Sequence, residues 1–125
     1  MNPRTALLLG SIFNLAFVVF HLLFWRIFHW RRDLRSLLPV NRAIMQVLNL
    51  CLTFAFAVFA IVSAFHGADM TGTALGRTLL ALISLFWFVR AIEQVVFFER
   101  TRLSAAFVVV FLLGTSLYAY VWASA

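Results

Sequence analysis

The sequence predicts an all-α membrane protein, a four-transmembrane-helix bundle whose helices run up and down in an antiparallel arrangement. Hydrophobic residues make up 65% of the 125 residues and charged residues only 11%, whereas soluble domains average about 45–50% and about 25%. The apolar residues also form four continuous runs, each near the roughly 20 residues that cross a hydrocarbon core of about 30 Å. Lipid is therefore the expected solvent for most of the surface, because a chain this short cannot bury so much apolar area.

The four runs predict helices over residues 6–27, 43–64, 75–98 and 103–122, within one transmembrane domain that covers residues 1–125. In lipid, only helices and closed barrels satisfy all backbone polar groups. The runs lack the alternating pattern of barrel strands, so helices are expected. The first run is longer than the apolar part of a signal peptide, and its basic cluster follows it, so it should stay in the membrane.

The arginines predict the orientation. The chain has ten arginines, no lysine and a formal net charge of +6. Basic residues gather on the cytoplasmic side of membrane proteins. The opposite side has only Arg4 and Arg77, so both termini are expected on the non-cytoplasmic side of a bacterial-type inner membrane. The arginines of the two predicted cytoplasmic connections are Arg26, Arg31, Arg32, Arg35, Arg42, Arg100 and Arg102.

Aromatic residues with a polar edge favour the same orientation, because tryptophan and tyrosine concentrate at the two membrane interfaces. Trp25 and Trp30 are predicted at the inner interface. Tyr118, Tyr120 and Trp122 are predicted at the outer interface.

The connection over residues 31–41 is expected to lie in the lipid headgroup layer, since leucines interleave with its arginines. We predict that Arg31, Arg32 and Arg35 contact lipid headgroups. Asn41, which follows a proline, is the predicted N-cap of the second helix.

The connection over residues 66–73 reads as a simple turn, because it contains Gly67 and Gly72. Gly72 and Gly76 also match the GxxxG pattern of helix dimers. This pair falls at the start of the third helix rather than at mid-membrane, so it argues only weakly for dimerisation.

Polar side chains inside membrane helices are costly and usually face the bundle interior or a wet cavity. Within each run, the polar residues are spaced three, four or seven apart and therefore share one helix face. The predicted candidates for a ligand or proton site are Asn14, His21, Gln46, Asn49, Arg90 and Glu93.

Counting from the predicted cytoplasmic end, His21 and Asn49 lie about 9 Å deep, Glu93 about 8 Å and Arg90 about 12 Å. These side chains can therefore meet in one layer of the inner leaflet, with Gln46 beside them and Gln94 as a further candidate.

This layer has two interpretations. It is either a structural network, with an ion pair between Arg90 and Glu93, or a site open to the cytoplasm or the inner leaflet. In such a site, His21 and Glu93 exchange protons and Arg90 binds an anion, a phosphate or a lipid headgroup.

No cofactor and no metal site is expected. Only His21 of the three histidines lies deep, Cys51 is the single cysteine, and no HExxH motif occurs. The sequence pI of about 11.4 would suggest nucleic acid for a soluble protein. Because the arginines flank apolar runs, we expect membrane lipids as partners and no nucleic acid.

Three functions fit these features. The first expectation is a small transporter or channel that works as a homo-oligomer, since four helices rarely enclose a full pathway. The alternatives are a membrane-embedded lipid-binding protein or lipid-modifying enzyme, and a non-catalytic accessory subunit of a larger membrane complex. Enzymatic activity is the weaker expectation, because no second catalytic carboxylate accompanies Glu93.

Overall fold

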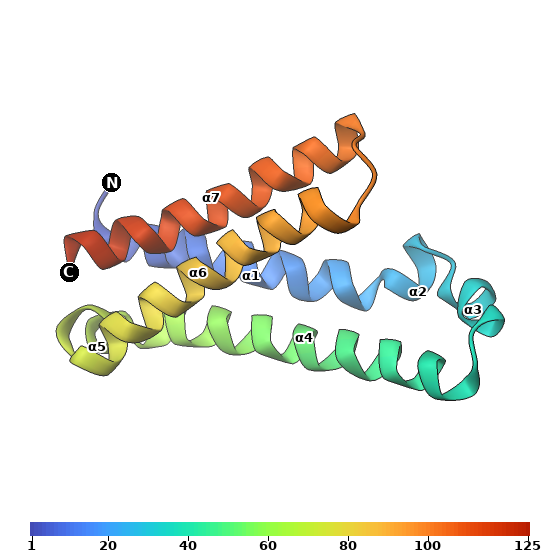
Figure 1. Ribbon diagram of the computed structural model, residues 1–125. Coiled ribbons are helices and arrows are strands. Elements are labelled where there is room, and N and C mark those ends of the chain that lie inside the picture. The colour runs from blue at the N-terminus through green and yellow to red at the C-terminus, as the bar shows by residue number, and fades with distance from the viewer.

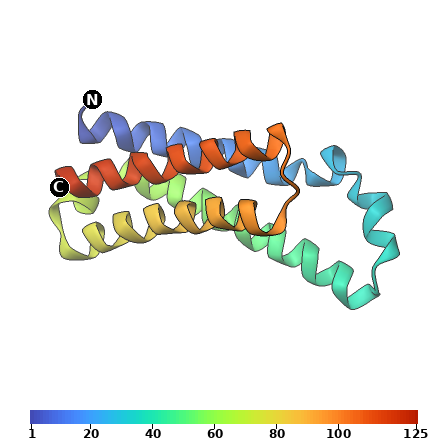
Figure 2. The ribbon, with the colours of Figure 1, turned by 45° about the horizontal axis from the view of Figure 1, so that its top comes forward.

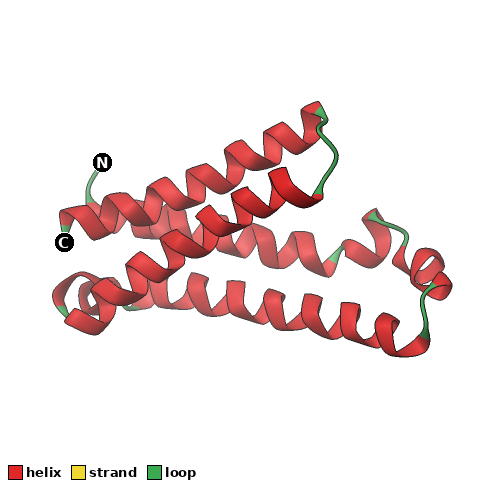
Figure 3. Cartoon of the chain, viewed as in Figure 1, coloured by secondary structure: helices red, strands yellow, loops and turns green.

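The computed structural model describes residues 1–125 and is helical throughout, without strands (Figure 3). Four helices are long and apolar enough to cross a membrane, which confirms the all-α class and the four predicted spans. The long helices are α1 (Pro3–Leu22), α4 (Pro39–Phe65), α6 (Ala74–Phe97) and α7 (Arg102–Ser124). The short helices are α2 (Phe24–Ile27), α3 (Trp30–Asp33), the 3-10 helix η1 (Leu34–Ser36) and α5 (Gly67–Gly72).

The helices form two pairs joined through α1. Helix α1 packs on α4 and on α7, and α7 packs on α6. Both termini lie at the end of the molecule that holds α5, which we call the terminal end (Figure 1). The opposite, arginine-rich end holds α2, α3, η1 and the connection between α6 and α7. Toward that end α4 diverges from the α6–α7 pair in both views (Figures 1 and 2).

The first predicted helix is interrupted. Helix α1 ends at Leu22, Leu23 forms a turn, and α2 continues the chain. The turn lets Phe24 stack on His21, with the ring centroids 4.3 Å apart. A second break follows at His29, whose φ of 53° lies in the left-handed region. The prediction of one helix over residues 6–27 is therefore wrong at its carboxyl end.

The start of α4 also differs from the prediction. The helix begins at Pro39 with Leu38 as its N-cap, so Asn41 lies inside the first turn and cannot cap it. Proline suits the first helical position, because an N–H there has no partner within the helix.

Within residues 66–73, Gly67–Gly72 form helix α5 rather than a simple turn. This helix buries Met70, which is 1% exposed. A Cβ atom on Gly76 would overlap the backbone of Asp69 and Met70, whereas one on Gly72 would meet nothing. Gly76 therefore serves the close approach of α5 and α6 within the chain.

The core is built around four aromatic rings, one from each long helix. Trp87 of α6 is 0% exposed. Its ring stacks on Phe56 of α4 and Phe111 of α7, with centroids 5.2 Å and 5.8 Å away. Phe17 of α1 packs against the same indole at 4.8 Å. We call these four residues the aromatic floor, because they close the base of the cavity described below.

Between the aromatic floor and the terminal end, a polar network ties three helices together. Asn14 of α1 donates to the Tyr118 hydroxyl of α7 at 2.8 Å. Ser63 of α4 lies 2.7 Å from the same hydroxyl. Tyr118 is only 1% exposed, so its ring faces the interior of the bundle rather than lipid. Its hydroxyl has two partners inside the bundle, which allows the ring to be buried.

Candidate functional site

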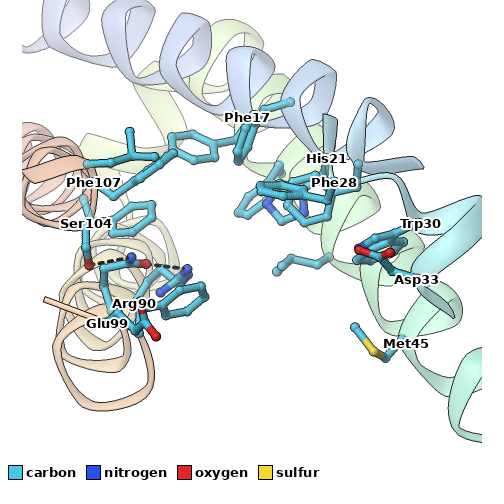
Figure 4. A pocket seen from close by; sticks show the side chains of 18 of the residues that line it. Phe17, His21, Phe28, Trp30, Asp33, Met45, Arg90, Glu99, Ser104 and Phe107 are labelled. Carbon is cyan, nitrogen blue, oxygen red and sulfur yellow. Dashed lines mark hydrogen bonds between the residues drawn. The ribbon is translucent and has the colours of Figure 1, made fainter. Parts of the chain in front are cut away.

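A cavity of about 880 Å³ lies between the aromatic floor and the arginine-rich end. Fifteen of the 22 residues that line it are hydrophobic. Figure 4 shows His21, Phe28 and Trp30 on one side, and Arg90, Glu99, Ser104 and Phe107 on the other. The cavity therefore separates the segment from α1 to η1 from the α6–α7 pair, where the two parts of the bundle diverge.

On the first side, His21 is held by two hydrogen bonds to Asn49 of α4. Asn49 Nδ2 donates to the backbone oxygen of His21 at 3.1 Å, and Asn49 Oδ1 lies 2.8 Å from His21 Nδ1. Because that oxygen only accepts, Nδ1 carries the hydrogen. In the neutral ring, Nε2 is then a hydrogen-bond acceptor, and no group of the chain bonds to it. Thr53 bonds to the Asn49 carbonyl at 2.7 Å and steadies this pair.

On the second side, Arg90 of α6 contributes the half-buried charge. Its Nη2 donates to Gln94 Oε1 at 3.0 Å, and Gln94 Nε2 donates to Ser104 Oγ of α7 at 3.0 Å. These are the dashed lines in Figure 4. The guanidinium lies over the rings of Phe111 and Phe98, 4.5 Å and 5.3 Å from their centroids. Hydrogen bonds and ring contacts together fix its position.

One guanidinium nitrogen, Arg90 Nη1, is buried and has no hydrogen-bond partner. Trp87 Nε1, in the aromatic floor, is a second buried donor without a partner. Buried polar groups are almost always satisfied. A cavity next to two unsatisfied donors, one of them cationic, has the chemistry to bind an anionic or acceptor group.

Two carboxylates also line the cavity, but neither neutralises Arg90. Asp33 and Glu99 are both exposed. Asp33 bonds instead to Arg32 Nε at 2.9 Å. The cavity thus has acids at its exposed rim and a fixed cation deeper inside.

The predicted polar layer is only partly assembled. His21 and Asn49 are hydrogen-bonded, and Arg90 lines the same cavity as His21. Glu93 is exposed, does not line the cavity and pairs with no cation. The salt bridge between Arg90 and Glu93 that the structural interpretation included is therefore absent. Gln94, four residues from Arg90, faces the bundle and takes that place.

Two other predicted residues lie outside the cavity. Gln46 accepts from Trp25 Nε1 at 3.1 Å and donates to the Arg42 carbonyl at 3.3 Å. Asn14 belongs to the network with Tyr118 and also donates to the Gly10 carbonyl at 2.8 Å. Both residues hold helices together in this structure.

The three arginines predicted at lipid headgroups are exposed on α3 and η1. Arg31 and Arg35 line a second, smaller pocket of about 220 Å³. Arg32 does not line it.

Sequence reasoning missed several partners of the site. Gln94 was a further candidate for the polar layer, and its spacing of four from Arg90 is one at which side chains meet on a helix. Ser104 comes from another helix and becomes its partner only through the packing of α6 on α7. The sequence could not show which of the chain's 15 phenylalanines pack against the guanidinium.

No three side chains of His, Cys, Asp or Glu lie close enough together to hold a metal ion. Comparisons of the chain with protein-family models, with curated proteins and with solved structures find no match. The geometry of the cavity is therefore what supports a function.

Proposed function

We propose that the protein is a membrane-embedded binding protein for an acidic amphiphile, a lipid with a carboxylate or phosphate group. The observation that carries this proposal is Arg90, a half-buried cation with one unsatisfied nitrogen, at the edge of a cavity lined mainly by hydrophobic residues. The guanidinium binds the acid group, and the phenylalanines on both sides bind the hydrocarbon tail.

Charge and size support this ligand class. A half-buried cation that forms no salt bridge is stabilised by an anion that enters the site. Arginine binds carboxylates and phosphates through two parallel hydrogen bonds. The volume of about 880 Å³ falls within the roughly 300–1,000 Å³ of small-molecule sites. His21 Nε2 adds an acceptor for a hydroxyl of the headgroup.

The proposal includes a membrane topology. The four long helices cross the membrane alternately, with both termini on the non-cytoplasmic side of an inner membrane. The arginines of the α2–η1 segment and of the α6–α7 connection support this orientation. The cavity then lies in the cytoplasmic half of the membrane, within reach of lipids of the inner leaflet.

The transporter hypothesis needs more than one copy of the chain. Between the aromatic floor and the terminal end, the interior is filled by side chains such as Leu80, Ile83 and Tyr118, which are 0–1% exposed. A path through the membrane would therefore run between copies of a homo-oligomer. The lipid-modifying enzyme remains a second candidate, because His21 Nε2 is a free acid–base group in the same cavity as Arg90.

The test compares Arg90→Gln with Arg77→Gln, an exposed arginine on the same helix. Delipidated protein is titrated with oleate and with methyl oleate, which has the same tail without the charge. We expect Arg90→Gln to weaken oleate binding about tenfold or more, because a charged hydrogen bond is lost. Arg77→Gln should bind like the unaltered protein, and Arg90→Lys should recover part of the affinity.

Two results would contradict the proposal. One is equal affinity for oleate and methyl oleate, which would show that the protein does not recognise the acid group. The other is an equal loss of oleate affinity in the Arg77 and Arg90 variants, which would show that the net charge of the protein, and not Arg90 itself, determines binding. Native mass spectrometry of protein purified in mild detergent adds an independent check, since an acidic lipid should remain bound.

A further inference from the structure

The smaller pocket lies at the arginine-rich end and is distinct from the cavity. It has a volume of about 220 Å³ and is formed by α2, α3, η1 and the start of α4. Its charged lining residues are Arg31, Arg35 and Arg42, and no carboxylate lines it. Three cations therefore surround one small space without a counter-ion from the chain.

This grouping is unfavourable unless an anion is bound. Arg31 and Arg35 are four residues apart, a spacing at which like charges repel on a helix. The nearest acid in the sequence, Asp33, is engaged by Arg32 at 2.9 Å and lines the larger cavity instead. Nothing in the chain offsets the repulsion.

Arg42 adds a half-buried guanidinium to the lining of the pocket. Its Nε is buried and has no hydrogen-bond partner. The backbone beside it is held by Gln46, whose Nε2 donates to the Arg42 carbonyl at 3.3 Å. The Gln46 side-chain oxygen is in turn occupied by Trp25 Nε1 at 3.1 Å. The Gln46 amide thus makes hydrogen bonds that hold the structure together. It does not bond to the Arg42 guanidinium, which can therefore bind a ligand.

The size of the pocket limits the ligand. About 220 Å³ is smaller than the roughly 300–1,000 Å³ that holds drug-sized molecules. It is large enough for a phosphate group with a few waters, since each water occupies about 30 Å³ in the liquid. Planar guanidinium groups match phosphate oxygens in pairs.

From the charge, the unsatisfied donor and the size, we infer that Arg31, Arg35 and Arg42 form a binding site for one phosphate group. The surroundings favour a phosphate on a lipid headgroup. Trp25 and Trp30 pack edge to face beside the pocket, with centroids 5.3 Å apart, and such rings settle at membrane interfaces. Leu38 and Val40 follow in sequence and are 69% and 61% exposed, which suits contact with lipid.

This site is separate from the amphiphile site, because it uses different cations. It also sharpens the headgroup prediction from the sequence. Arg31 and Arg35 belong to the site, Arg42 joins them from the next helix, and Arg32 does not take part.

The test uses the full chain in detergent and three soluble probes: dihexanoyl phosphatidic acid, dihexanoyl phosphatidylcholine and inorganic phosphate. Binding is measured by calorimetric titration of the unaltered protein and of Arg42→Gln. The matched control is Arg32→Gln, which removes the same charge from the neighbouring helix α3. Arg90→Gln serves as the second control, because it removes the cation of the other cavity.

We expect saturable binding of the phosphatidic acid. In the Arg90→Gln background, where the larger cavity has lost its cation, the remaining binding should weaken about tenfold or more when Arg42→Gln is added and stay unchanged when Arg32→Gln is added. The phosphatidylcholine should bind more weakly, because its choline cancels the charge. Inorganic phosphate that competes at similar concentration would support the site and assign it to a soluble phosphate. Competition only at large excess would support a lipid source.

Equal weakening in Arg32→Gln and Arg42→Gln would overturn the inference, since overall charge would then explain the binding. Absence of saturable binding by every probe would overturn it as well. If Arg42→Gln does not fold, as judged by circular dichroism and gel filtration, the double variant Arg31→Gln/Arg35→Gln replaces it. Both of those side chains are exposed, so their loss should not disturb folding.

Discussion

The hydroxyl of Tyr118 connects three of the four long helices. It accepts a hydrogen bond from Asn14 of α1, lies 2.7 Å from Ser63 of α4, and belongs to α7. The ring also covers Gly10 so closely that a Cβ there would lie 2.8 Å from the hydroxyl oxygen. A single phenol thus fixes how α1 and α7 approach each other.

We expect Tyr118→Phe to lower the free energy of unfolding by about 1 kcal/mol, a typical value for a hydrogen bond within a membrane bundle. Equilibrium unfolding in detergent micelles or bicelles measures the change. Tyr120→Phe is the matched control, because Tyr120 is exposed and bonds only to the backbone of Met1. Similar losses in the two variants would show that the buried network contributes nothing beyond a surface contact.

Individual residues also show which contacts of the site could be predicted from the sequence. The pairing of His21 with Asn49 could be predicted, because both lie at the same depth on helices that follow each other in the chain. The pairing of Arg90 with Glu93 could not be judged from spacing alone. Residues three and four apart both neighbour Arg90, and the rotation of α6 decides that Gln94 faces inward and Glu93 outward.

At the scale of elements, the long helices could be predicted well and the short ones could not. A continuous hydrophobic run is enough to predict a membrane span. The start of a helix also has a local signal, since the side chains of Thr73 and Thr101 cap the amino-terminal ends of α6 and α7. The breaks before and after α2, and the helix α5, depend on contacts between elements. Phe24 turns back onto His21, and Met70 is buried beneath α6. Such contacts leave little trace in a hydropathy pattern.

Helix α5 gives a sharp test of packing between elements. Gly76→Ala should destabilise the protein by about 1–3 kcal/mol, because the new methyl group meets backbone atoms that cannot move aside cheaply. Gly72→Ala, four residues earlier, meets nothing within 4 Å and should change stability by no more than about 0.5 kcal/mol. Thermal unfolding followed by circular dichroism compares the two. Equal stability would mean that α5 does not pack on Gly76.

For the whole molecule, the distribution of arginines predicts its direction in the membrane. The expected topology places Asn2 outside and Ser36, in η1, inside. In a Cys51→Ser background, which removes the only cysteine, Asn2→Cys and Ser36→Cys each carry one thiol. An impermeant maleimide should label Asn2→Cys on intact spheroplasts, and Ser36→Cys only after permeabilisation. The reverse pattern would overturn the orientation inferred from the arginines.

The two pockets share a wall. Trp30 and Leu34 line both the cavity and the arginine pocket, so the short segment of α3 and η1 is the partition between them. A ligand that displaces this partition from one side alters the shape available on the other. Thermodynamic linkage makes such an effect reciprocal. If a bound phosphate group raises the affinity for an amphiphile by some factor, the bound amphiphile raises the affinity for the phosphate group by the same factor. If both proposed sites bind their ligands, this partition would couple them as an allosteric pair within a chain of 125 residues.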